Sequence, residues 1–113
     1  MALQEQIRKG TTEIIILSLL ADLDRAMYGY EIIKELEARS EGFFEFKEGL
    51  IYPRLHEMER QGLLRSEWHG EEGSRKRKFY AITAEGRRQL ARDVESWQEF
   101  AENVSRLLGV EPA

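Results

Sequence analysis

The spacing of hydrophobic residues changes twice along this chain of 113 residues, and these changes limit the folds that it can adopt. As far as residue 61 the apolar residues recur at the intervals of an α-helix. From residue 64 to residue 82 they alternate, as in two β-strands that flank a polar turn containing glycine. The helical interval then returns. The pattern predicts a mainly α protein with one small β-hairpin (α+β), in the order helix, helix, helix, hairpin, helix.

The first predicted helix begins near Thr11 or Thr12, either of which can cap it. From Ile14 to Leu23 its residues are apolar on nearly all sides, which is typical of a helix that protein covers all round. A strand is the alternative for the three consecutive isoleucines, but the length of the run and its caps favour a helix. In so short a chain, such a helix suggests that a partner subunit covers part of it.

Two further helices are predicted before the hairpin, one starting at Gly29 and one running from about Glu48 to Gln61. Each has a buried stripe with a polar face opposite. The buried residues are Ile32, Ile33 and Leu36 in the second helix, and Ile51, Leu55 and Met58 in the third. On or near the opposite face of the third helix lie Gly49, Tyr52, Pro53, His56 and Arg60.

The last predicted helix is capped by Thr83 and stops at Gly109. Its apolar residues follow one another at intervals of 4, 3, 4, 3 and 4: Leu90, Val94, Trp97, Ala101, Val104 and Leu108. This heptad spacing is typical of a narrow seam between two helices, as in a coiled coil. It predicts that the last helix pairs with a second copy of the chain.

Composition excludes several classes of protein. Without cysteine the chain forms no disulfide and no cysteine-ligated zinc site, which fits a reducing cytoplasm. The longest apolar stretch is about half of the ~20 residues that span a bilayer. His56 and His69 have no partner at metal-ligand spacing, and no nucleophile with a base is recognisable. We expect a cytoplasmic protein that spans no membrane, binds no metal or cofactor and is not an enzyme.

The net charge of −4 opposes binding to nucleic acid, but the charges are unevenly distributed. The run Arg75–Lys78 is basic throughout. From residue 93 onward five acids face a single base, Arg106; the acids are Asp93, Glu95, Glu99, Glu102 and Glu111. The sequence therefore predicts a molecule that is locally positive at the hairpin and acidic at its C-terminal helix.

Three helices followed by a basic hairpin are the layout of a winged helix-turn-helix. In this module the last of the three helices enters the DNA major groove, and the hairpin contacts phosphates or the minor groove. We predict contacts with double-stranded DNA from Lys47, Tyr52, Arg54, His56, Arg75, Lys76, Arg77 and Lys78. A solvated strand face is the alternative for the basic run. Residues 1–82 would form the winged-helix DNA-binding domain and residues 83–113 the C-terminal dimerisation helix.

Four aromatic residues have two interpretations each. We expect Tyr28 and Tyr30 to be core and capping residues rather than DNA ligands. We expect Trp68, at the base of the hairpin, to be a packing anchor. Trp97 lies in the middle of the heptad seam, where it is either interface core or part of a ligand pocket.

Four stretches of the chain resemble the PadR-like family of transcriptional regulators: TTEIIILSLL, YGYEIIKEL, EGLIYPRLHEMERQGLL and RKRKFYAITAEGRRQL. In order, they cover nearly the whole chain, from about Arg8 to Leu108. The resemblance implies a winged-helix homodimer that represses nearby genes and releases DNA when a small molecule or another signal arrives. The single short C-terminal helix is similar to that of the family's shorter subgroup.

In multidrug-binding members of that subgroup, an aromatic residue at the position of Trp97 lines a pocket between the subunits. The resemblance thus implies a small aromatic effector and a pocket or dimer interface formed by Glu13, Ile14, Leu17, Leu90, Val94, Trp97 and Ala101. Those relatives carry an acid where this chain has Ala101, so a cationic ligand would need the charge of Glu13. Two alternatives remain: a small-molecule-binding dimer, and a winged helix that binds another protein without specific DNA binding.

Overall fold

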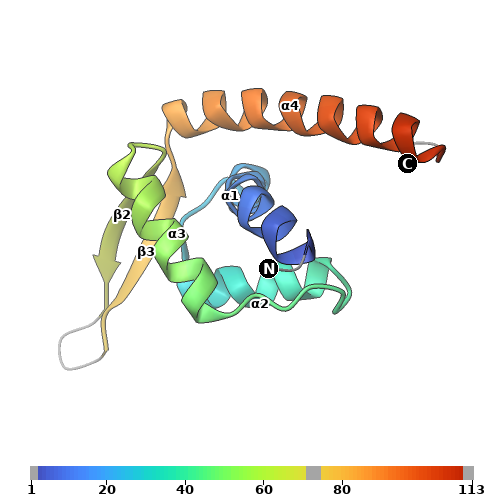
Figure 1. Ribbon diagram of the computed structural model, residues 1–113. Helices are drawn as coiled ribbons and strands as arrows, with labels where there is room; N and C mark the ends of the chain where they lie inside the picture. The colour runs from blue at the N-terminus through green and yellow to red at the C-terminus, as the bar shows by residue number, and fades with distance from the viewer. Residues whose placement is uncertain (1–2, 71–74, 111–113) are drawn as a thin grey trace.

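The computed structural model describes the backbone of residues 3–70 and 75–110, and the side chains within these ranges from residue 11 onward. The elements in chain order are α1 (Leu3–Leu23), β1 (Met27–Tyr28), α2 (Gly29–Arg39), α3 (Glu48–Arg60), β2 (Leu64–His69), β3 (Arg77–Ile82) and α4 (Ala84–Leu108). The predicted fold class is confirmed, because the chain is mostly helical with a small antiparallel sheet and a long last helix (Figure 1).

The sheet has three strands in the order β1-β3-β2, so the hairpin predicted from the sequence is extended by one strand. In the hairpin, Leu64 lies opposite Ile82 and His69 lies opposite Arg77. The added strand β1 has two residues, and its Met27 lies opposite Tyr80. Two residues are too few to show an alternating pattern, and β1 was therefore not predicted. The predicted turn includes residues 71–74, which lie outside the described residues.

Helix α1 begins at Leu3, so the start predicted at Thr11 or Thr12 is wrong. Both threonines lie inside the helix, and Thr12 is buried. The residues before them are mainly good helix formers, and the helix therefore continues through the predicted cap. The apolar run that follows provides the centre of the core, where Ile16, Leu17 and Leu20 are fully buried.

The other core helices have the predicted boundaries and stripes. Helix α2 begins at Gly29 and buries Ile32, Ile33 and Leu36. Helix α3 buries Ile51, Leu55 and Met58, and it tolerates Pro53 close to its start. Figure 1 shows α1 between α4 on one side and α2 with α3 on the other, while the hairpin lies at one end.

The start of α4 is fastened to the turn that joins α3 to β2. Thr83 caps α4 as predicted, because its Oγ1 accepts a hydrogen bond from the Gly86 amide at 3.0 Å. The same hydroxyl lies 2.7 Å from the Gly62 carbonyl oxygen and 3.0 Å from that of Leu63. Gly86 is buried against this turn, and a Cβ there would lie only 2.2 Å from the Leu63 carbonyl oxygen. The backbone of α4 thus approaches the turn too closely for any side chain.

We expect Gly86→Ala to lower the free energy of unfolding by about 1–3 kcal/mol, because backbone atoms must move to admit the methyl group. Gly49→Ala is the matched control, since a Cβ at this α3 position meets no atom within 4 Å. It should raise the free energy of unfolding by about 0.5–1 kcal/mol, because alanine suits a helix better than glycine. Urea unfolding measures both. Equal effects in the two variants would contradict the close contact of α4 with the turn.

Candidate nucleic-acid interface

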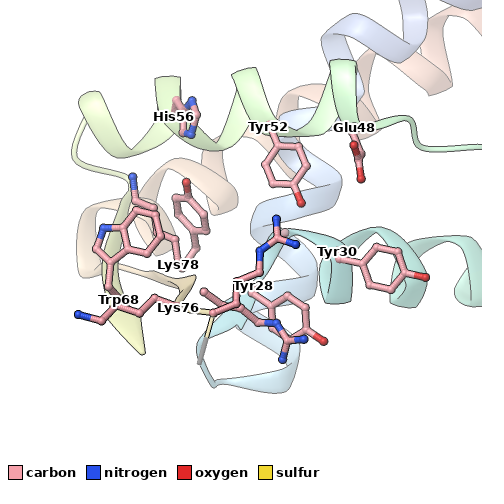
Figure 2. Close-up of a pocket in the computed structure, with 12 residues that line it drawn as sticks. Tyr28, Tyr30, Glu48, Tyr52, His56, Trp68, Lys76 and Lys78 are labelled. Carbon is pink, nitrogen blue, oxygen red and sulfur yellow. The ribbon is translucent and has the colours of Figure 1, made fainter. Parts of the chain in front are cut away.

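A groove of about 580 Å³ lies between α3, the start of α2 and the hairpin. Six of the eight residues predicted to contact DNA line it: Tyr52, His56, Arg75, Lys76, Arg77 and Lys78. Figure 2 shows the Tyr52 ring pointing from α3 into the groove, with His56 one turn farther along the helix and Lys76 and Lys78 on the hairpin side. The structure therefore brings polar side chains of the third helix and cations of the hairpin to one surface.

Two of the predicted residues lie elsewhere. Lys47 is exposed at the N-cap of α3, outside the groove lining. Arg54 lies on the flank of α3 that faces α1, where its Nη1 is 3.5 Å from Oε1 of Glu13. Arg54 was predicted to contact DNA and Glu13 to line a ligand pocket, but in the structure they form one ion pair. Both side chains are about a third exposed, so the pair contributes little to stability.

The basic run of the hairpin divides into two pairs of residues. Arg75 and Lys76 are exposed, and within the described part of the chain no carboxylate forms an ion pair with either. Arg77 lies over the Tyr28 ring, with 4.7 Å between its Cζ atom and the ring centroid. Lys78 is half-buried, and its Nζ is 3.0 Å from Oε1 of Glu59 on α3. Arg75 and Lys76 are therefore the cations that are most available to an outside anion.

The Tyr52 ring is packed directly on Gly29, the first residue of α2. A Cβ at Gly29 would lie 2.3 Å from Cε1 of Tyr52 and 2.9 Å from its hydroxyl oxygen. Burial raises the pKa of the Tyr52 phenol, Glu48 raises it further and Arg75 lowers it in part. The hydroxyl is thus protonated at neutral pH and can donate a hydrogen bond to a phosphate oxygen.

Three aromatic residues that were not predicted to contact DNA also line the groove. Two of them are Tyr28 and Tyr30. Tyr28 is the N-cap residue of α2, although its side chain makes no capping hydrogen bond, and Tyr30 is 51% exposed and therefore not a core residue. Trp68 also lines the groove and is 64% exposed, so it is not a packing anchor. On β2 it shares a face with buried Leu64, as the alternation predicts. The alternation predicts on which face of the sheet a side chain lies, but it does not predict whether another element covers that face.

The residues predicted for a ligand pocket or dimer interface are only partly brought together. Ile14 and Val94 both line a second cavity of about 310 Å³, between α1, α4 and the segment that joins α2 to α3. Leu17 lies instead in the core of the single chain, fully buried. Leu90 packs partly against that core, and Ala101 is half-buried.

Trp97 lies farther along α4 and is 41% exposed. Its ring stacks on Phe100, with 6.0 Å between the ring centroids and 29° between the planes. Phe100 is more exposed than Trp97, and it was missed because it lies outside the heptad seam. Beyond these two residues, Leu107 and Leu108 are also exposed. The C-terminal half of α4 therefore presents a strip of apolar side chains that the described part of the chain leaves exposed.

Neither a cluster of metal ligands nor a membrane-spanning helix is found in the part of the chain that the structure describes. Among the described residues, no three His, Asp or Glu side chains are grouped so that they could hold a metal ion. No helix in the described ranges combines the length and the apolar character needed to cross a membrane.

We expect Gly29→Ala to displace the Tyr52 ring, because the new methyl group and the ring cannot occupy the same space. In a Tyr52→Ala background the same methyl group has room. The loss in free energy of unfolding caused by Gly29→Ala should therefore be larger in the otherwise unchanged chain, by about 0.5–3 kcal/mol. Urea unfolding of the parent, the two single variants and the double variant measures this difference. Equal losses in both backgrounds would contradict the packing of Tyr52 on Gly29.

Comparison with known proteins agrees with this geometry. Residues 16–92 match the family model of the transcriptional regulator PadR-like family. A solved transcriptional regulator from Clostridium thermocellum superposes with a TM-score of 0.82 at 28% identity, over 89% of this chain and 96% of that one. A PadR-like regulator from Bacillus cereus has a TM-score of 0.74 at 33% identity, over 94% and 99%. The transcriptional regulator Rv3488 of Mycobacterium tuberculosis is 33% identical over 72% of each chain. This chain belongs to the PadR-like family of transcriptional regulators.

Proposed function

We propose that this regulator is a homodimeric repressor that binds double-stranded DNA through α3 and the hairpin and responds to a small ligand. The observation that carries the proposal is the groove in which Tyr52 and His56 of α3 lie near the cations of the hairpin. A helix of this kind fits the major groove, while hairpin cations bind phosphates beside it. Arg75 and Lys76 are best placed for the phosphates because both are exposed.

The distribution of charge supports this orientation in spite of the net charge of −4. The hairpin and the C-terminal end of α4 lie at opposite ends of the molecule (Figure 1). Glu95, Glu99 and Glu102, in the later part of α4, are thus far from the basic hairpin, and DNA that approaches the hairpin avoids them. We place the DNA-binding domain in residues 1–82 and the dimerisation helix in residues 83–113.

Dimerisation through α4 would cover the apolar strip that this chain leaves exposed. Trp97, Phe100 and Leu108 are 41%, 55% and 70% exposed, and heptad spacing suits pairing with another helix. A two-fold dimer would present two α3 helices to successive major grooves, about 34 Å apart on one side of the duplex. The position of α4 relative to α3 would then determine which DNA sites fit.

In this proposal the protein is cytoplasmic, and its effector is a small planar aromatic molecule that stacks on or near Trp97. A ligand shifts the equilibrium between DNA-binding and non-binding forms of the dimer only if it binds more tightly to one spacing of the two α3 helices than to another. A site at the α4 interface meets this requirement, because it lies where the two subunits meet. Glu13 is already paired with Arg54, so it provides little free charge for a cationic ligand.

A gel shift with the DNA that flanks the regulator's own gene tests the function directly. We expect retention at low salt, which decreases as salt rises and as planar aromatic molecules are added. Quenching of Trp97 fluorescence by such molecules without any DNA retention would favour a small-molecule-binding dimer instead. Absence of DNA retention together with a protein captured in pull-downs would favour an interaction module.

We expect Lys76→Ala to weaken binding to all DNA sequences, because a phosphate contact carries no sequence information. The slope of log K against log salt should become shallower by about one unit. Arg106→Ala at the far end of α4 is the control, since it removes the same charge from an exposed position away from the hairpin. Equal loss of affinity in the two variants would contradict phosphate contact by the hairpin.

Trp97→Ala should weaken the dimer, because truncation of an aromatic residue at the centre of an interface costs roughly 2 kcal/mol, or about 30-fold in Kd. Sedimentation equilibrium measures the dimer directly. Trp68→Ala removes an even more exposed tryptophan that lies in the groove, and it should leave the dimer unchanged. A dimer that is unaffected by Trp97→Ala would place the interface elsewhere.

A further inference from the structure

We infer that Glu59 is a positioning residue for DNA binding: its carboxylate fastens the hairpin to α3 and so holds the hairpin cations in place beside that helix. This inference rests on the proposed DNA binding and goes further, because it assigns a favourable role to an acid beside a phosphate-binding surface. Simple electrostatics would give such an acid the opposite effect, since a carboxylate repels phosphate.

One carboxylate bridges three elements. Glu59 belongs to α3, and its Oε1 is 3.0 Å from Nζ of Lys78 on β3. Its Oε2 accepts a hydrogen bond from the hydroxyl of Ser66 on β2. Both strands of the hairpin are therefore bonded to the same side chain of the helix that is proposed to read DNA.

The Lys78 ammonium group is held by aromatic rings as well. Its Nζ lies 5.3 Å from the centroid of Tyr80 and 6.0 Å from that of Trp68. The Lys78 and Glu59 side chains are 26% and 32% exposed, whereas Arg88 and Glu85 in an ordinary surface pair on α4 are 62% and 49% exposed. The less exposed pair is less screened by solvent, and more partners restrain it.

The charge states favour this contact at neutral pH. The hydrogen bond from Ser66, followed by that from Lys78, lowers the pKa of Glu59 below its usual value. The hydrogen bond to Glu59 raises the pKa of Lys78. Both groups are consequently charged when DNA binding is measured near neutral pH.

The connection matters because it joins α3 to the hairpin beyond the residues that the core already holds, which are Leu64 on β2 and Tyr80–Ile82 on β3. Only residues 61–63 separate α3 from β2. Lys78 precedes the buried part of β3 and lies two residues from Lys76, so fixing Lys78 also restricts where Lys76 can lie. A loose hairpin would have to be ordered when DNA binds, which weakens binding. In this arrangement Lys78 holds the hairpin, while Arg75 and Lys76 remain available to phosphates.

Glu59→Gln and Glu57→Gln distinguish positioning from charge. Each removes one acid from α3, but within the described residues Glu57 bonds to Arg60 and Gln61, at the end of the same helix, and to no part of the hairpin. If only charge matters, both variants bind DNA as tightly as the parent or more tightly. If Glu59 positions the hairpin, Glu59→Gln binds about fivefold or more weakly, with a salt slope shallower by about one unit. Glu57→Gln should not weaken binding.

Two further tests do not depend on Glu59→Gln: the variant Ser66→Ala, and an exchange of the charges of Glu59 and Lys78. Ser66→Ala changes no charge and should weaken DNA binding in the same direction, to a smaller extent. Lys78→Glu should weaken binding strongly, and adding Glu59→Lys restores an ion pair of reversed polarity at the parent's net charge. The exchanged chain should therefore recover part of the lost affinity. Thermal melts followed by circular dichroism confirm that each variant is folded.

Two results would overturn the inference, and they differ in what else they affect. If the parent binds DNA but Glu59→Gln binds as tightly as Glu57→Gln, and the charge exchange recovers nothing, Glu59 has no positioning role. The proposed function would then stand. If the parent binds no DNA even at low salt, the proposed function fails, and the inference fails with it.

Discussion

The burial of α1 is the interaction on which the rest of the structure depends. Ile16, Leu17 and Leu20 are fully buried, and burial of each such side chain contributes about 1.5–3 kcal/mol. Because α1 lies between α4 and the pair α2 and α3, one helix supports both proposed surfaces (Figure 1). Because the core is closely packed, a shift of α4 or of α3 also requires the side chains of α1 to move. A second connection lies at the N-terminal end of α4, where Thr83 bonds to the turn after α3.

The hairpin shows how a chain with excess acid can still present a basic surface. Its four consecutive cations have different surroundings: Arg77 lies on an aromatic ring, Lys78 is paired with an acid of α3, and two remain exposed. Local arrangement thus determines which charges an outside anion meets, and the net charge of the chain does not.

Much of the fold could be predicted because periodicity depends on neighbours along the chain. The stripes of α2 and α3, the two strands of the hairpin and the cap at Thr83 all follow from local spacing. The failures have equally physical causes. Strand β1 is too short to have a period, and the threonine cap signal at the start of α1 was overridden by a preceding segment that also favours helix. Trp68 lies on the predicted face of β2, but it is 64% exposed because no further element of the described chain packs on that part of the face.

By itself, the sequence determined the order of elements, the basic run at residues 75–78 and the heptad spacing of α4, since each depends on residues close in the chain. Only the tertiary structure decided which partner each charged residue meets. Arg54 faces Glu13, 41 positions earlier in the chain, and Lys78 faces Glu59. It also decided that Tyr52 requires a glycine at position 29. These contacts join separate elements, and their geometry exists only once α1, α2, α3 and the hairpin have packed together.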